Sequence, residues 1–247
     1  MSEEYYLGGY YLLQLTPCTF GTYKDTILYS CSNCLNDNLM EGWITAKPEL
    51  LEKMKAKYGI DDSGADSIQK WIGEKFDTRQ IITPDAFPER ALAVEFQSGF
   101  FSHLNNVALL SIHFDRLEAN ELLNEFNPKE TRIVTGINEI LGKNIPENHD
   151  ERFLGFDLIG IENGGQFHSF HCHDIGKELE NRFGLQLNRC GLFENSNRWA
   201  EVTACLNDQE IGCEPVPWFV TKVKMVKTGT NKEAETPQKS REQRSIW

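Results

Sequence analysis

Apolar residues gather along this chain in two kinds of run, short extended blocks and segments with helical spacing. Residues 5–15 are mostly aromatic and aliphatic, which favours a β-strand, and Gly8 and Gly9 predict a bulge or bend within it. Residues 107–114 are almost all apolar, as is typical of a strand buried on both faces. Further strands are predicted at 26–31, 154–161, 166–172 and 218–226, the last with a lysine face turned to water.

Helical spacing is clearest after Pro48, a residue that suits the first turn of a helix. Leu50, Met54 and Tyr58 then recur on one helical face, and Gly59 favours a left-handed stop. The same reasoning predicts further helices at 67–76, 116–126, 133–141 and 175–183, with caps at Asp66 or Ser67, at Asp115 and at Asp174.

A hairpin is predicted to join residues 154–161 to residues 166–172 through a Glu-Asn-Gly-Gly turn, since Asn and Gly tolerate the positive φ that tight turns need. With the Asn-Gly pair at the centre of the turn, Ile159 faces His168. Paired residues share a face of the sheet, so Asp157 and His168 become diagonal neighbours on one face.

The order of these elements indicates the α+β class, with a mixed or mainly antiparallel sheet and several packed helices. Strands and helices alternate without a strict βαβ rhythm, and no glycine fingerprint of a nucleotide-binding sheet occurs. Residues 1–227 are predicted to form a single domain. Residues 228–247 have almost no apolar content and are predicted to be a disordered basic tail.

Composition indicates the size of the core, the cellular location and the state of the cysteines. The chain has 247 residues, of which 40% are hydrophobic, enough for a substantial core. No run of 18 apolar residues predicts a membrane span, and the acidic N-terminus lacks the pattern of a secretory signal. We therefore expect a cytoplasmic protein. Its seven cysteines, an odd number, indicate free thiols or a metal site in place of a disulfide framework.

The formal charge of −12 is unevenly divided. Residues 221–247 carry seven basic and three acidic side chains, or +4, so residues 1–220 carry −16. Such an acidic body repels phosphate backbones and anionic membranes, so we expect no nucleic-acid or membrane partner. The charge is suited to a basic protein partner, and the alternative is that it serves solubility alone.

A zinc site is one candidate for chemistry. Cys31 and Cys34 form a CxxC motif, whose spacing allows two thiolates to bind one zinc ion. On a strand, His171 and His173 point to the same face and can supply the remaining ligands. The alternative is that the cysteines are ordinary reduced thiols and the histidines lie at a strand end without a metal.

The second candidate is the pair Asp157 and His168, which can perform general acid–base chemistry if the carboxylate orients the imidazole. The alternative is a structural hydrogen bond that satisfies two buried polar groups. Trp218 offers a further choice: exposed, it anchors an interface, and buried, it belongs to the core.

Two main functional hypotheses follow. The first is a non-enzymatic cytosolic interaction module whose acidic body binds a basic protein partner, as an inhibitor or neutralising protein. The second is a hydrolase or metal-dependent enzyme that uses the His, Cys and Asp residues of the 154–174 hairpin. A structural zinc ribbon within a binding module is a third option.

Overall fold

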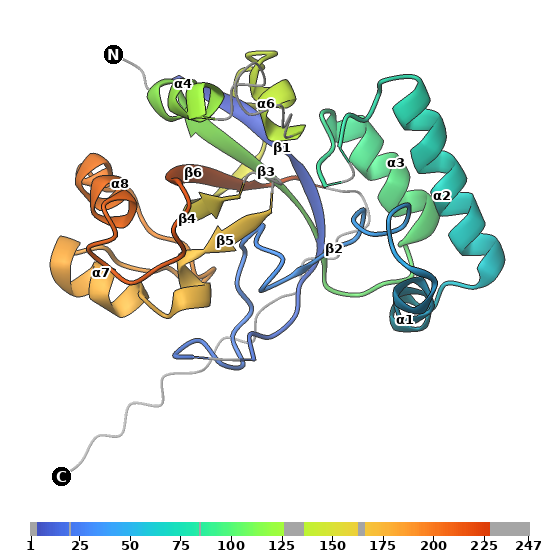
Figure 1. Cartoon of the computed structure of the whole chain (residues 1–247), viewed down its shortest axis with the longest axis horizontal. Coiled ribbons are helices and arrows are strands. Elements are labelled where there is room, and N and C mark those ends of the chain that lie inside the picture. Colours follow the sequence, from blue (N-terminus) through green and yellow to red (C-terminus); the bar gives the residue numbers. More distant parts are fainter. Residues whose placement is uncertain (1–3, 20, 84, 126–135, 163–165, 228–247) are drawn as a thin grey trace, which may run out of the picture.

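A computed structural model describes residues 4–19, 21–83, 85–125, 136–162 and 166–227 (Figure 1). Its centre is one six-stranded sheet in the order β2-β1-β3-β6-β4-β5, and every neighbouring pair of strands is antiparallel. The strands are β1 Tyr5–Gln14, β2 Asp37–Asn38, β3 Val107–Asp115, β4 Arg152–Ile161, β5 Phe167–Ser169 and β6 Trp218–Met225. The α+β class and the mainly antiparallel sheet are therefore confirmed.

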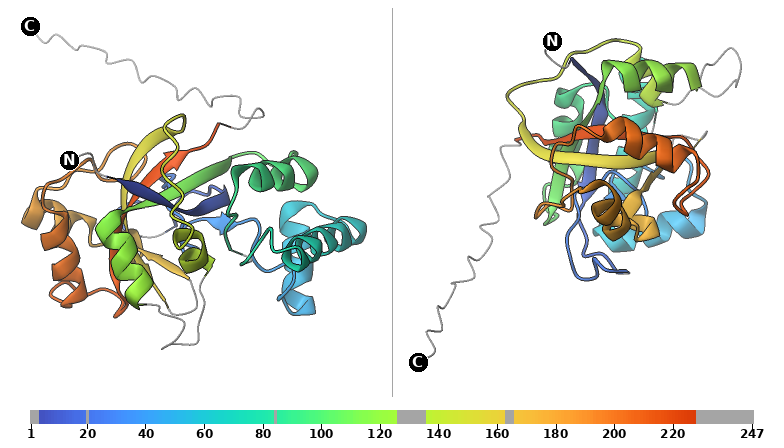
Figure 2. Two further views of the ribbon diagram at one scale, coloured as in Figure 1. Left: turned by 90° about the horizontal axis from the view of Figure 1, so that it is seen from above. Right: turned by 90° about the vertical axis from the view of Figure 1, so that its left-hand side faces the viewer.

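Helices cover both faces of the sheet (Figure 1, Figure 2). One group lies on the side of β1 and β2, a second on the side of β4 and β5, and a third at one end of the sheet. These are, in turn, α1 Pro48–Tyr58, α2 Asp62–Asp77 and α3 Arg90–Phe100; α7 Gly176–Phe183 and α8 Trp199–Asn207; and α4 Arg116–Glu125 and α6 Gly136–Leu141.

At β4 and β6 the sheet separates two hydrophobic cores, because alternate residues point to opposite faces, whereas both faces of β1 and β3 pack into one of these cores. Ile159 of β4 packs into the core that contains β1, β3 and α1 to α3, whereas Leu158 packs into the core beneath α7 and α8. Both side chains are buried. This double burial explains the nearly continuous apolar runs in the sequences of β1, β3 and β4.

Several local predictions are confirmed. Gly59 ends α1 in the left-handed conformation, with φ of 65°. The register of β1 against β3 shifts between Leu7 and Gly9, which is the expected bulge. The Asp115 carboxylate caps α4 by accepting from the backbone N–H groups of Leu117 at 2.7 Å and Glu118 at 3.0 Å.

Other local predictions are wrong. Residues 26–31 do not form a strand, and Ile27 makes only an isolated bridge to Pro17. Helix α2 begins at Asp62 instead of at the predicted residue 67, because Asp61 accepts a hydrogen bond from the backbone N–H of Gly64 at 2.7 Å and so caps an additional turn. Helices α3 and α8 were not predicted. Asp174 does not cap α7, whose N-cap is Ile175 without a side-chain hydrogen bond, because Asp174 ends the preceding 3-10 turn in the left-handed conformation.

The lysine face of β6 is not wholly in water. Lys224 is buried, and its ammonium group donates to the backbone oxygen of Asn148 at 2.7 Å and pairs with Glu147 at 2.5 Å. Strand β6 lies between β3 and β4, so residues that precede β4 cover this lysine. The alternation of side chains along a strand shows which residues share a face, but the segments packed against that face decide whether it is exposed to solvent.

Across the described parts of the chain, none of the helices combines the length and hydrophobicity that crossing a membrane requires. The predicted tail at 228–247 and most of the predicted hairpin turn lie outside the described residues.

Candidate functional site

The hairpin of β4 and β5 forms, but its register differs from the predicted one. Gly160 pairs with His168, and Ile159 pairs with Ser169. Since side chains alternate between the faces, a slip of one residue moves His168 to the other face of the sheet. Asp157 and His168 therefore lie on opposite faces, and the expected diagonal contact between them is absent.

Asp157 lies in the core, not in an open site. Its side chain is buried, and the Ser169 hydroxyl donates to Oδ1 at 3.4 Å. Burial raises the pKa of this carboxyl to about 7, although hydrogen bonds from Ser30, from the Leu158 backbone and from Ser169 oppose the rise. Its neighbours give it the properties of a structural polar group inside the sheet.

The returning strand ends at Ser169, where the 3-10 helix η1 Phe170–His173 begins. The Ser169 hydroxyl accepts the backbone N–H of His171 at 3.3 Å and so caps this turn. His171 and His173 are consequently not on a strand and do not share a strand face, as the zinc hypothesis had required.

His171 is a buried histidine with a structural hydrogen bond. Its Nε2 donates to the backbone oxygen of Gly191 at 2.7 Å, and the ring of Tyr23 contacts it edge-on at a centroid distance of 4.5 Å. Burial lowers the pKa of His171 to about 4, so the imidazole is neutral at physiological pH.

The two cysteines of the CxxC motif have different surroundings. Cys31 is buried, and burial together with the charge of Asp157 raises the pKa of its thiol. Cys34 is exposed and contacts the thiol of Cys172, which also lies 3.5 Å from the Ser32 hydroxyl. The structure does not bring Cys31, Cys34, His171 and His173 to one point.

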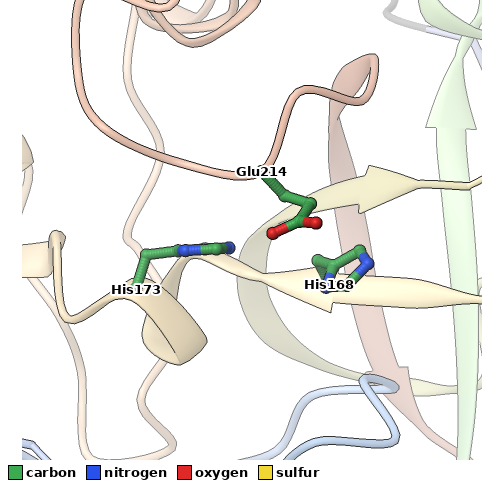
Figure 3. A group of neighbouring side chains, drawn as sticks. All are labelled: His168, His173 and Glu214. Atoms are coloured by element: carbon green, nitrogen blue, oxygen red, sulfur yellow. The ribbon is translucent and has the colours of Figure 1, made fainter.

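A different cluster does converge. Within the residues that the structure describes, one group of three or more His, Cys, Asp or Glu side chains has ligand atoms close enough for a shared metal: His168, His173 and Glu214, all within 4.8 Å of one another (Figure 3). It takes His168 from the predicted acid–base pair and His173 from the predicted zinc set.

Three separate segments supply this cluster. His168 is the central residue of β5, His173 ends η1, and Glu214 lies in the connection from α8 to β6. The ring of His173 lies 6.3 Å from that of His168 and 5.9 Å from that of Trp218, measured between centroids. Sequence reasoning missed Glu214, because no spacing links residue 214 to the hairpin.

The protonation of the cluster follows from its contacts. Nε2 of His168 lies 2.7 Å from the Glu162 carboxylate, which accepts a hydrogen bond from it. Burial lowers the pKa of His173, the charge of Glu214 opposes this effect, and nearby His168 reinforces it. Burial thus favours the neutral imidazole of His173, in which one ring nitrogen has a lone pair. Two imidazoles and a carboxylate in this arrangement can hold a divalent metal.

Comparison with protein-family models, curated proteins and solved structures finds no match for this chain.

A second polar cluster contains the residue types of a hydrolase but is closed to solvent. The Ser111 hydroxyl donates to Glu151 at 2.5 Å, and Nε2 of His113 lies 3.0 Å from the same hydroxyl. All three side chains are buried, and burial lowers the pKa of His113. The cluster ties β3 to the residue before β4 and offers no access to a substrate.

Most of the acidic side chains lie at the surface, but burial raises the pKa of Glu118 on α4 to about 8 and also raises that of Asp85. Glu151 and Asp157 are the carboxylates with buried side chains among the described residues. Many of the basic side chains already pair with carboxylates of the same chain: Lys55, Lys57, Lys70, Lys75, Arg182, Arg198, Lys222 and Lys224. Because acidic residues outnumber basic ones, the carboxylates that have no basic partner give the surface a net negative charge.

Proposed function

We propose that this protein is an interaction module whose acidic surface binds a basic protein partner, as an inhibitor or neutralising protein. The observation that carries the proposal is the net charge of −16 on residues 1–220, together with the pairing of the chain's own basic side chains. Surface charge of one sign raises the rate at which an oppositely charged protein associates, and it repels polyanions.

The charge is spread over the fold instead of being confined to one element. Residues 1–100 carry −6 and residues 101–220 carry −10. The second half includes α7, on which Glu178 and Glu180 are exposed, and the connection that holds Glu214. We therefore propose that the partner docks on the side of the molecule covered by α7 and α8.

The hydrolase alternative has less support than the interaction module. A hydrolase that uses Asp157 and His168 requires contact between these two side chains, and the strand register separates them. A metal-dependent function retains a structural basis in the cluster of His168, His173 and Glu214.

The test is affinity capture with the full chain, followed by the equilibrium constant of the identified complex at 50 and 300 mM salt. We expect a partner of high isoelectric point and a dissociation constant that rises about tenfold or more with salt, since exposed charges are screened beyond a Debye length of roughly 10 Å at 0.1 M. An affinity independent of salt would overturn the proposal.

Charge-neutralising variants test the position of the interface. Replacing Glu178 and Glu180 with Gln on α7 should slow association with the captured partner several-fold. The matched control replaces Asp66 and Asp77 with Asn on α2, where both residues are exposed, and should have a smaller effect. Equal effects of both pairs would show that the net charge acts without a defined face.

A further inference from the structure

We propose that His168, His173 and Glu214 form a binding site for one divalent transition-metal ion of the zinc class, with Glu162 orienting His168. This proposal does not depend on the partner-binding function. Figure 3 shows the three side chains directed toward a common space from three separate segments.

His173 presents a ring nitrogen that lacks a hydrogen-bond partner among the described residues. Nε2 of His173 is buried without a hydrogen-bond partner, in the part of the chain that the structure describes. A buried polar atom without a partner is costly, and binding an ion removes that cost. A metal ion is a partner that an imidazole nitrogen and a carboxylate oxygen can share, since each can offer a lone pair.

Glu162 fixes the orientation of the His168 ring through a hydrogen bond. The Nε2–H group of His168 donates a hydrogen bond to the Glu162 carboxylate at 2.7 Å, and in this tautomer Nδ1 has the lone pair. Metal-binding histidines usually donate their other ring nitrogen to a carboxylate in this way, and the contact fixes both the tautomer and the ring orientation. Glu162 thus acts as a positioning residue and not as a ligand.

The connection that contains Glu214 is held in place by close packing against β4 and by a hydrogen bond from Trp218. A Cβ atom on Gly160, the partner of His168 across the hairpin, would lie 2.7 Å from Val216 and 3.0 Å from the ring of Trp218. The connection is therefore pressed closely against β4 beside His168. The indole N–H of Trp218 also donates to the backbone oxygen of Glu214 at 3.0 Å, which holds the position of this residue.

The required movement is small. Ligand atoms around a tetrahedral zinc ion are about 3.3 Å apart, as bond lengths of roughly 2.0–2.1 Å require. The three ligand atoms already lie within 4.8 Å of one another, so side-chain rotations that bring them at most about 1.5 Å closer together complete the site. Two imidazoles favour zinc and related transition metals, whereas magnesium and calcium prefer oxygen ligands.

Three protein ligands leave one tetrahedral position open. The three residues of the cluster are only partly buried: the His168 side chain is 18% exposed, and that of its neighbour Glu162 is 39% exposed. An ion can therefore enter from solvent, and the fourth position can take water or a group from another molecule.

The test is titration of tag-free, chelator-treated full-length protein with zinc chloride by calorimetry, together with elemental analysis. We expect one zinc per chain. His173→Ala and Glu214→Gln should each weaken binding at least about 100-fold, and Glu162→Gln should weaken it roughly 10–100-fold. The matched controls His149→Ala and Glu194→Gln alter exposed residues outside the cluster and should bind as the parent does.

Cobalt(II) distinguishes this site from one built on thiols. Bound through nitrogen and oxygen, cobalt shows visible ligand-field bands without the near-ultraviolet charge-transfer bands of thiolate ligands. Those thiolate bands, or loss of binding in Cys34→Ala, would overturn the proposal. So would the absence of stoichiometric zinc, or unchanged affinity in both His173→Ala and Glu214→Gln with circular dichroism showing that the variants are folded.

Discussion

Replacing Asp157 with Asn tests how this buried carboxyl affects stability. Its pKa is about 7 in the folded protein and 3.8 in a model compound, because burial penalises the charged form. The folded protein therefore holds a proton that the unfolded chain releases, and the free energy of unfolding falls as pH rises from about 4 to 7. A shift of about three pKa units corresponds to roughly 4 kcal/mol.

The assay is urea unfolding, followed by tryptophan fluorescence, of parent and Asp157→Asn proteins at pH 5 and pH 8. Asn has no charge to desolvate, so the stability difference between variant and parent should shift by roughly 3 kcal/mol toward the variant at the higher pH. Comparing the two proteins is necessary because His171, whose pKa is lowered to about 4, makes stability rise from pH 4 to 6.5 in both.

The control is Asp66→Asn, a change at an exposed position on α2. It should give a difference that hardly changes with pH. Imperfect packing of the new amide beside Ser30 and Ser169 would lower the stability of Asp157→Asn by a constant amount. A difference for Asp157→Asn that is the same at pH 5 and pH 8 would refute the reasoning, since it would mean that the carboxyl pays no burial penalty in the folded state.

Two further predictions concern packing and charge. Gly160→Ala should destabilise the fold by roughly 1–3 kcal/mol, since the new Cβ would lie 2.7 Å from Val216. Gly73→Ala, a helical position with open space, should be neutral or stabilising by up to about 1 kcal/mol. Equal thermal midpoints for these two variants would contradict the first prediction. Glu147→Gln should cost roughly 3–5 kcal/mol in urea unfolding at pH 7, because it leaves the Lys224 ammonium buried without its ion pair. A loss below about 1 kcal/mol would show that the Asn148 backbone oxygen suffices.

The candidate site was only partly accessible to sequence reasoning. The turn residues predicted the hairpin correctly. Its register, however, places one more residue between the paired strand positions than the predicted tight turn does, and this shift puts Asp157 and His168 on opposite faces of the sheet. Likewise, the strand assumed for His171 and His173 ends at Ser169, whose hydroxyl caps the 3-10 turn. Side-chain capping by a serine competes with strand extension, and local propensity does not decide between them.

The sequence by itself determined the class of fold, most of the strands, the cap at Asp115, the stop at Gly59 and the negative charge. These features depend on local periodicity, on backbone preferences of single residues, or on counting. Only the tertiary structure decided that Asp157 and Lys224 are buried and that Glu214 meets His168 and His173. Burial and convergence depend on which distant segments pack together, and that is set by the whole core rather than by any one stretch of sequence.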